Sequence, residues 1–492
     1  MNLSADTLQS INPATRELLG EVSLTPVSEV ATQAARAKSA QEMWGEMSLK
    51  TRARILTDIR KQLVKKGNAI ARLIADETGK TEWEGWIEIL QTAEHFRTVC
   101  RTGPQVLRRE RRSPGLLRYK RASVQYLPWG VAGIISPWNY PLTLTAGPLC
   151  EALMAGNGVI IKPSELTPLV GREIETLFLE SGLPEGLVQF VYGFGDVGAA
   201  LVESPDTDIL CFTGSVAVGR AIAERCGQLL KPVILELGGN DPFIVLEDAP
   251  LNRAARAAAW GGFTNAGQTC ISVERVIVVE SVVDEFLAHL QAETEKLRVG
   301  PDKKKADMGA IINERQKQSI LKQIREADAR ITCGGDDLEG ELNGWFIRPC
   351  VVEVDSPDQT LTQKETFGPV ITVQRVADEE EAIRVANATE YGLNASIFTG
   401  NRERALRLSR ALRTGNVCIN DVLSNYFCTH LPFGGVGISG IGRVHGPEGL
   451  KSFSRIQAVC EDRLGLKKEL WWYPVSRTVQ SLFKFTFRAF YG

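Results

Sequence analysis

From Val131 onward the sequence alternates short apolar runs with segments of helix length, and this rhythm limits the fold more than any other feature. The first runs lie at 131–136, 159–162, 187–192, 208–212 and 233–237. Strands separated in this way are typical of βαβ units and a parallel, doubly wound sheet. A second set follows, with strands expected at 243–246, 273–279, 370–373, 395–398 and 417–420 and helices at 282–297, 314–327, 379–388 and 402–412. The sequence therefore predicts two doubly wound α/β domains that meet near Gly239.

The residues before Val131 are mainly of helical pattern. Residues 1–26 read as extended chain with a turn at 12–15, and apolar residues then recur at three-to-four-residue spacing as far as about 101. Gly79 is placed to end one of these helices. The basic run 108–112 is expected to be a solvated loop, as most single charge runs are.

Composition excludes several classes of protein. The 492 residues carry a net charge of -2, which gives no field for attracting nucleic acid. The ten cysteines have neither paired nor metal-ligand spacing and the four histidines are dispersed, so we expect reduced thiols and no metal site. No secretory signal opens the sequence, and no apolar run approaches the roughly 18 residues of a membrane span. These features favour a cytoplasmic protein.

One cysteine stands at the end of a predicted element. The helical pattern 251–263 runs into a Gly/Asn-rich break that delivers Cys270 just ahead of the apolar run 273–279. A thiol in that place can be held rigidly and face a cleft. Only the thiolate attacks well, so the site must lower the thiol pKa or supply a base. Because a single cysteine is more often a buried packing group, the motifs around it have to decide.

Several motifs follow the strands of the first set, where ligands bind in such sheets. The stretch 193–198 fits G-x-G-x-x-G, but the acidic residue expected about 20 positions later is missing. The turn 212–215, which opens a predicted helix at 216–226, is a better site for a pyrophosphate because of its exposed N–H groups and the positive helix end. Lys162 and Glu165 either bond ribose hydroxyls or form a surface ion pair.

Two further residues complete a chemical set with Cys270. Glu236 ends a predicted buried strand, and burial would raise the pKa of its carboxyl toward that of a useful general base. Asn139 offers an amide donor for an oxyanion. A thiol nucleophile, an oxyanion donor, a carboxylate base and a dinucleotide site together make up the equipment for oxidising an aldehyde.

At this point the sequence resembles the aldehyde dehydrogenase superfamily, from about Asn12 to Phe453. The matching motifs are 137–141 (PWNYP), 162–165 (KPSE), 212–215 (FTGS), 236–239 (ELGG), 267–270 (GQTC), 365–369 (ETFGP) and 432–435 (PFGG). The resemblance implies that Cys270 is the nucleophile, that Glu236 activates water, and that Asn139 with the Cys270 N–H forms the oxyanion hole.

The resemblance also implies a cofactor, NAD or alternatively NADP, and the residues that bind it. Lys162 and Glu165 would hold the adenosine ribose, residues 214–215 the pyrophosphate, and Glu365 with Phe367 the nicotinamide riboside. The full expected set is Ser136, Pro137, Trp138, Lys162, Ser164, Glu165, Gly195, Phe212, Gly214, Ser215, Val218, Leu237, Gly238, Glu365 and Phe367.

The domain plan implied by the family is an aldehyde dehydrogenase-like fold with a small β-extension. A Rossmann-like cofactor domain would span 1–115 and 132–238, and a catalytic domain 239–440. Oligomerisation strands at 116–131 and 453–465 would join subunits into a homodimer or homotetramer, and 466–492 would form an amphipathic tail.

The function has alternatives. An acylating relative passes its thioester to coenzyme A and usually lacks the carboxylate of Glu236, while a silent binding scaffold would not need the complete chemical set. The stretches 420–437 and 470–474 resemble the fatty aldehyde dehydrogenase branch, which favours apolar aldehydes of medium or long chain; a semialdehyde substrate is the alternative, although no arginine pair stands out for its carboxylate.

The tail beyond residue 465 has two readings. Its aromatic residues are spaced for an amphipathic basic helix that lies on a membrane, yet residues 483–488 also alternate as a half-buried strand would. A peripheral membrane contact, a substrate lid and a purely structural role in packing all remain open.

Overall fold

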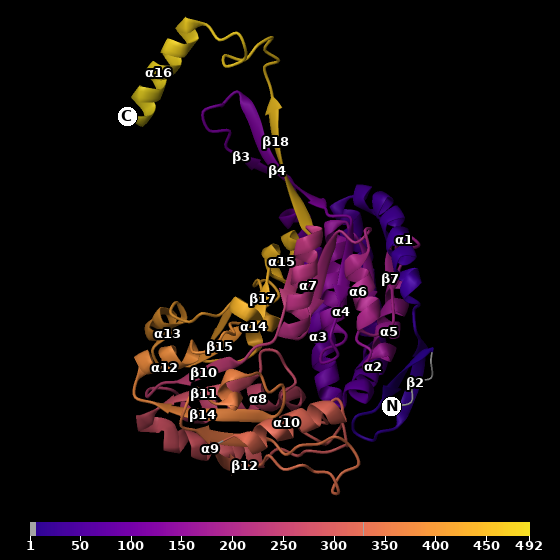
Figure 1. Ribbon diagram of the computed structural model, residues 1–492, viewed down its shortest axis with the longest axis vertical. Coiled ribbons are helices and arrows are strands. Elements are labelled where there is room, and N and C mark those ends of the chain that lie inside the picture. Colours follow the sequence, from indigo (N-terminus) through magenta and orange to yellow (C-terminus); the bar gives the residue numbers. More distant parts are fainter. Residues whose placement is uncertain (1–5, 328) are drawn as a thin grey trace. The chain divides into compact units, whose positions relative to one another are not determined.

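The structure is a computed structural model that describes residues 6–327 and 329–492 (Figure 1). Contacts divide the chain into two compact units. The first contains the chain up to residue 107 together with 127–455, and the second contains 108–126 and 456–492. The division of the first unit into a cofactor domain and a catalytic domain near Gly239 stays a prediction, as do the oligomerisation strands.

The first unit begins with a hairpin and a run of helices. The elements are β1 (Thr7–Ile11), β2 (Leu18–Ser23), α1 (Val27–Glu46), α2 (Leu49–Thr78) and α3 (Glu82–Val106). As predicted, Gly79 ends a helix: it caps α2 with a left-handed φ of 75°. Helix α3 starts at a capping box, in which the Thr81 hydroxyl accepts from the Glu84 N–H and the Glu84 carboxylate accepts from the Thr81 N–H.

A six-stranded sheet of order β17-β9-β8-β5-β6-β7 follows. Its strands are β5 (Val131–Ile135), β6 (Gly158–Lys162), β7 (Val188–Phe190), β8 (Ile209–Thr213), β9 (Val233–Glu236) and β17 (Gly440–Ile441). The five predicted strands run parallel, while the very short β17 pairs antiparallel with β9. The chain moves from β5 outward to β7 and then returns to β8 on the other side. In doubly wound sheets this reversal opens the crevice in which ligands bind.

Helices cover this sheet. They are α4 (Thr143–Ala155), α5 (Pro168–Leu179), α6 (Gly195–Glu203) and α7 (Val216–Leu229). Helices α1, α6 and α7 share one buried apolar cluster with the sheet, to which Ala34, Leu201 and Cys226 belong. Helix α4 is buried on almost every side because it lies between strands β5 and β6 and helices α2 and α3.

A seven-stranded sheet forms the rest of the first unit, in the order β12-β13-β14-β11-β10-β15-β16. Its strands are β10 (Asp241–Val245), β11 (Val273–Val279), β12 (Arg330–Cys333), β13 (Cys350–Val354), β14 (Val370–Val376), β15 (Asn394–Phe398) and β16 (Asn416–Ile419). Five of these match predicted strands. Strands β12 and β13 were missed; β12 is a partly exposed antiparallel edge strand, which lacks a buried apolar signature.

The helices of this second part are mostly those predicted. They are α8 (Leu251–Phe263), α9 (Val283–Glu295), α10 (Glu314–Glu326), α11 (Thr360–Gln363), α12 (Glu379–Ala386), α13 (Arg402–Ser409), α14 (Ser424–Phe427) and α15 (Gly446–Ser452), with 3-10 turns at Thr264–Gly267, Glu280–Val282 and Gly437–Ser439. Strand β11 leads directly away from the Cys270 turn, and α8 leads into it.

The second compact unit is small. Strands β3 (Glu110–Arg112), β4 (Lys120–Pro128) and β18 (Ser454–Asp462) form a sheet of order β18-β4-β3, and α16 (Arg477–Tyr491) follows (Figure 1). The expected loop at 108–112 was wrong in part: residues 110–112 pair with β4, and backbone pairing of this kind leaves no trace in side-chain charge. The tail is helical rather than extended over residues 477–491.

All ten cysteines are free. Over residues 6–327 and 329–492, no cluster of three metal-ligating side chains is found, and no helix is long and apolar enough to cross a membrane.

Candidate active site

Cys270 follows a tight turn between α8 and β11. Asn265, Ala266 and Gly267 all have left-handed backbones, with φ of 52°, 53° and 70°, a conformation that costs energy for a residue with a side chain. At the third position glycine is required, since a Cβ on Gly267 would lie 2.0 Å from the carbonyl oxygen of Gly368. Such a backbone persists only where its surroundings hold it.

Buried side chains supply that support. The Asn265 N–H donates to the Glu84 carboxylate at 2.6 Å. The Gln268 side chain donates to the Asn265 carbonyl at 3.0 Å and accepts from the Ile312 N–H at 2.9 Å. The T-x-x-E pattern at 81–84 indicates a helix start in the sequence, but nothing in it shows that Glu84 also fixes the nucleophile turn.

Asn139, on the loop after β5, reaches the same turn. Its side-chain amide donates to the Gln268 carbonyl at 3.0 Å, and its own carbonyl accepts from the Asn265 side chain at 3.0 Å. Asn139 and Cys270 line one cavity. An amide N–H beside a thiol is the arrangement that can stabilise an oxyanion formed on a carbonyl substrate.

Behind Asn139 lies a buried ion pair that sequence reasoning missed. The Lys80 ammonium donates to the Asn139 carbonyl at 2.7 Å, lies 3.3 Å from the Glu88 carboxylate and stands 4.2 Å from the centroid of the Tyr140 ring. The other Glu88 oxygen accepts from the Leu142 N–H at 2.7 Å. Both charged side chains are fully buried. The pair thus ties the start of α3 to the loop that carries the amide, a contact that no local sequence pattern announces.

The Cys270 thiol is half-buried. Burial raises the pKa of this thiol, and the nearby carboxyl groups of Asp241, Glu365 and Glu236 raise it further. The protonated thiol is therefore the resting form at neutral pH. Nucleophilic attack by this group needs a proton acceptor.

Glu236, at the end of β9, is a candidate for a general base that acts on water. Its carboxyl is buried, and burial raises its pKa well above the ordinary value of 4.5, with Arg443 offsetting part of the rise. Within the described chain neither carboxyl oxygen has a hydrogen-bond partner. The group lines the cavity that contains Cys270, so it is placed to exchange a proton with water there.

Glu365 and Phe367 lie on the turn before β14. One Glu365 oxygen accepts from the Gly239 N–H at 3.1 Å, and a Cβ on Gly238 would lie 2.1 Å from the other oxygen. Glu274, buried on β11, accepts from the Phe367 N–H at 2.9 Å and so holds this turn in place. A Cβ on Gly238 would thus displace this carboxylate, and a Cβ on Gly239 would lie 2.2 Å from the Cys270 carbonyl oxygen.

A long cleft runs past the carboxyl ends of β5, β6 and β8. Lys162 and Glu165 form an ion pair of 3.2 Å there, and the Ser215 hydroxyl caps α7 by accepting from the Val218 N–H at 3.4 Å. A helix start of this kind favours a phosphate group. The predicted residues that line the cleft are Ser136, Pro137, Trp138, Lys162, Ser164, Glu165, Gly195, Phe212, Gly214, Ser215 and Val218.

The cleft continues into the cavity at Cys270. Pro137, Trp138, Gly214 and Ser215 line both spaces. The remaining predicted residues line the inner cavity: Asn139, Glu236, Leu237, Gly238, Cys270, Glu365 and Phe367. The donors, the ion pair and the close backbone fit an extended dinucleotide whose one end reaches Cys270.

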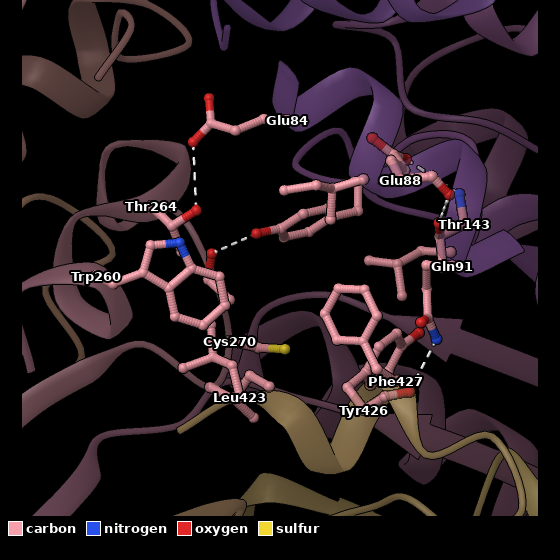
Figure 2. Close-up of a pocket in the computed structure, with 15 residues that line it drawn as sticks. Glu84, Glu88, Gln91, Thr143, Trp260, Thr264, Cys270, Leu423, Tyr426 and Phe427 are labelled. Atoms are coloured by element: carbon pink, nitrogen blue, oxygen red, sulfur yellow. Dashed lines mark hydrogen bonds between the residues drawn. The ribbon is translucent and has the colours of Figure 1, made fainter. Parts of the chain in front are cut away.

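A second, apolar pocket approaches Cys270 from the other direction, and the sequence did not predict its lining. Its space, open mouth included, is about 690 Å³. Figure 2 shows the aromatic side chains of Trp260, Tyr426 and Phe427 around the Cys270 sulfur. The lining residues are Glu84, Ile87, Glu88, Gln91, Tyr140, Thr143, Leu144, Trp260, Thr264, Thr269, Cys270, Ile271, Leu423, Tyr426 and Phe427.

Most polar groups of that pocket are engaged, although the Gln91 side-chain oxygen has no hydrogen-bond partner within the described chain. Glu84 bonds the nucleophile turn and Glu88 the buried Lys80, while the Tyr140 hydroxyl meets the Thr269 hydroxyl at 2.9 Å. The lining contains neither arginine nor lysine. The pocket thus offers an apolar wall and no cation for a second carboxylate on the substrate.

Comparison with known proteins identifies the family. The model of the aldehyde dehydrogenase family matches residues 2–459. The chain belongs to the aldehyde dehydrogenase family. Among curated relatives of this enzyme, the 4,4'-diapolycopene aldehyde oxidase of Methylomonas sp is 38% identical over 99% of this chain and 92% of that protein. A "putative succinate-semialdehyde dehydrogenase" of Mycobacterium tuberculosis is 34% identical over 92% of this chain and 90% of the other.

Solved structures agree. The NAD-dependent aldehyde dehydrogenase of Sinorhizobium meliloti superimposes with a TM-score of 0.91 at 31% identity, covering 95% of this chain and 94% of the other. The Mycobacterium tuberculosis aldehyde dehydrogenase complexed with NAD+ gives 0.90 at 33% identity, covering 94% and 96%. These matches confirm the predicted family and the predicted α/β fold class of this oxidoreductase.

Proposed function

We propose that the enzyme oxidises apolar aliphatic aldehydes of medium or long chain to carboxylic acids with NAD(P)+. One observation carries this proposal: Cys270 is the meeting point of a polar cleft fit for a dinucleotide and an apolar pocket that contains no arginine or lysine. A nucleophile so placed has an aldehyde on one side and a hydride acceptor on the other.

The reaction begins at the thiol. The Cys270 thiol gives its proton to water in the cavity, its sulfur adds to the aldehyde carbon, and the carbonyl oxygen becomes an oxyanion that accepts hydrogen bonds from the Asn139 amide and the Cys270 N–H. NAD(P)+, when bound in the cleft, supplies the acceptor for the hydride that leaves this carbon. A thioester then joins the acyl group to Cys270.

Glu236 completes the cycle. Its carboxylate takes a proton from water, the resulting hydroxide attacks the thioester carbon, and the carbon–sulfur bond breaks to release the acid and the Cys270 thiolate. Burial raises the pKa of this carboxyl above its ordinary value, which makes its carboxylate a stronger base. Its presence also speaks against an acylating enzyme, which would hand the thioester to coenzyme A, and the complete set of reactive groups speaks against a silent scaffold.

The binding roles follow from the placement in the cleft. Lys162 and Glu165 hold the adenosine ribose, the N–H groups at the start of α7 hold the pyrophosphate, and Glu365 with Phe367 holds the nicotinamide riboside. Glu165 would bond a ribose 2′-hydroxyl and repel a 2′-phosphate, so NAD is preferred and NADP is the alternative. A higher kcat/KM for NADP would contradict this preference.

The apolar pocket supports one substrate class over the other. A semialdehyde carries a second carboxylate, and the walls of this pocket present the carboxylates of Glu84 and Glu88 but no cation. The Methylomonas relative is named for a diapolycopene aldehyde rather than a semialdehyde. These two points together support apolar aldehydes over succinate semialdehyde.

The small sheet of the second unit supports assembly with further copies. Strand β18 is nine residues long and pairs on one side only, with β4. An edge strand of that length is a template for pairing with another chain, so the enzyme forms a homodimer or homotetramer through it. Light scattering on the full chain measures the assembly directly.

Initial rates on a substrate series test the function. Hexanal, decanal and tetradecanal are compared with succinate semialdehyde, with NAD and with NADP, by following absorbance of the reduced nicotinamide with and without coenzyme A. We expect kcat/KM to rise from hexanal to decanal and to be lowest for succinate semialdehyde, with no dependence on coenzyme A. Preference for the semialdehyde would refute the substrate class, and a strict requirement for coenzyme A would refute hydrolysis.

A further inference from the structure

The C-terminal tail, residues 463–492, presents an unusual number of large apolar side chains to solvent. No residue of α16 is buried. The exposed apolar side chains are Leu464, Leu466, Leu470, Trp471, Trp472, Tyr473, Leu482, Phe483, Phe485, Phe487, Phe490 and Tyr491. A set of this size on one short segment calls for a partner that covers it.

The root of the tail is fixed within its own unit. Glu469 is 4% exposed; its carboxylate is ion-paired with Lys120 of β4 and accepts from the Tyr119 hydroxyl at 2.7 Å. Asp462 also contacts Lys120, at 3.1 Å. Glu469, the only acidic residue of the tail, is thus already paired where the tail begins. The aromatic side chains beyond it stay exposed to solvent.

Helix α16 separates its cations from its apolar side chains. At about 100° per residue, Arg477, Lys484 and Arg488 fall within an arc of about 40°. Opposite them the apolar arc contains Val479, Leu482, Phe483, Phe487 and Phe490. The helix has no acidic residue. This division, with basic groups on the polar face and aromatic residues on the other, is that of helices that lie in a membrane interface.

Charge separates the tail from the rest of the chain. It contains six Lys and Arg residues and one Glu, whereas the whole chain has a net charge of -2. The remainder is therefore net negative, although residues 108–121 of the same unit add seven Lys and Arg residues and one Glu. Trp471, Trp472 and Tyr473 add side chains that favour the water–hydrocarbon boundary.

We propose that the tail is a lipid-surface contact: α16 lies along an anionic bilayer, its apolar arc enters the acyl boundary, and Arg477, Lys484 and Arg488 face the headgroups. A second copy of the chain is a poorer occupant, because three aligned cations in a protein interface would need acidic partners. A 15-residue helix with three cations is too short and too charged to span a bilayer.

This contact deepens the proposed function and rests on it for its purpose. Aldehydes with long apolar chains concentrate in lipid. An enzyme held at the lipid surface meets its substrate where the substrate dissolves, whereas an enzyme for small polar aldehydes would gain nothing from such a tail. The lipid contact itself can be measured without any aldehyde.

Co-sedimentation with vesicles tests the contact. The full chain is mixed at low salt with vesicles of phosphatidylcholine alone or with added phosphatidylglycerol. We expect binding to the mixed vesicles that weakens as salt is raised, and little binding to phosphatidylcholine. Because each Lys or Arg near an anionic surface contributes about fivefold in affinity, the double variant K484E/R488E should lose at least about tenfold.

A matched pair of variants tests the apolar arc. The triple variant F483S/F487S/F490S should lose binding to mixed vesicles. F490S alone should lose more binding than F485S, because Phe490 lies about 140° from the centre of the cationic arc and the equally exposed Phe485 only about 80° from it. Circular dichroism and the hexanal rate show that each variant is folded. No binding of the unmodified chain to anionic vesicles would overturn the proposal.

Two further outcomes keep the alternatives distinct. If F483S/F487S/F490S breaks up the oligomer in light scattering while the unmodified chain ignores vesicles, the partner is a second copy and the lipid proposal fails. If the unmodified chain binds vesicles but oxidises no apolar aldehyde, the lipid contact stands and the proposed function fails.

Discussion

The two approaches to Cys270 are built by different means. The cofactor cleft is made of loops that follow parallel strands, and each loop carries a short run of special residues, such as 162–165 or 212–215. The aldehyde pocket is walled by single side chains from helices and by the short segment 423–427. The residues of the cofactor cleft thus lie in contiguous sequence motifs, whereas the residues of the aldehyde pocket are scattered along the sequence.

The difference has a physical cause. A dinucleotide is bound by backbone N–H groups and close backbone approach, which demand glycine, a helix start and fixed spacing. An apolar chain requires only volume and the absence of unpaired polar groups. Many residue combinations meet that second requirement, so the aldehyde side can vary while the cofactor side cannot.

The largest effect should come from the atom the two sides share. Cys270→Ser is expected to lower kcat by about 10⁴-fold or more, since the hydroxyl is a far poorer nucleophile and no base adjoins it. Binding of NAD, measured by fluorescence quenching, should stay within about threefold because the cleft is unchanged. A variant that keeps a substantial rate would remove Cys270 from the mechanism.

Glu236→Gln is expected to impair only the hydrolysis of the thioester, the second half of the reaction. Steady turnover should fall by about 10²–10⁴-fold, the range for loss of a general base, while one equivalent of reduced cofactor still appears in a burst. Mass spectrometry after mixing with decanal and NAD should then show the acylated protein. Normal turnover without accumulation would exclude Glu236 as the base.

The pH dependence gives this prediction a second readout. The carboxylate of Glu236 must be ionised to act, so kcat should rise with pH through a pKa well above 4.5, and Glu236→Gln should lose that limb. Stability runs the other way: a raised folded pKa means that the carboxyl stabilises the fold at low pH and that this contribution is lost as pH rises. At alkaline pH the melting temperature of the glutamine variant should therefore rise relative to that of the parent enzyme.

How far the sequence could predict this site follows from the same contrast. The parallel strands and helix α8 could be predicted because each depends on local periodicity. Contiguous motifs single out Cys270, Glu236 and Asn139, whose catalytic roles stay predictions. Strand β12 escaped because it is a partly exposed edge strand, whereas β13 was missed although four of its five residues are buried. Lys80 and Glu88 could not be assigned a role, since their contact with the Asn139 loop exists only after α3 and the β5 loop are packed together.

The buried pair of Lys80 and Glu88 supports the Asn139 loop from the side of the aldehyde pocket, so it tests the comparison of the two sides further. In Lys80→Met the ammonium that bonds the Asn139 carbonyl is lost and Glu88 is left unpaired. We expect kcat to fall by up to about 10²-fold, as for a small misplacement of a catalytic group, with KM for NAD little changed. If the role is positional, Lys80→Arg should recover part of kcat; equal losses in both variants together with a large fall in melting temperature would mark the pair as structural only.

The smallest effect should come from the side chains that line the aldehyde pocket, and it should depend on the substrate. Trp260 lines the apolar pocket and is 45% exposed, whereas Trp83 is 71% exposed and lies outside the lining. Trp260→Ala should lower kcat/KM for decanal about tenfold, since one lost apolar contact surface discriminates substrates by about 1–3 kcal/mol, and should change the hexanal rate less because a short chain reaches less of the wall. Trp83→Ala should change neither.

Initial rates with both aldehydes measure the ratio, and an equal loss for both would mean that Trp260 shapes the Cys270 turn rather than the chain-length preference. The contrast between the two sides of the sulfur would then fail, because a residue of the apolar wall would prove as tightly constrained as any in the cleft.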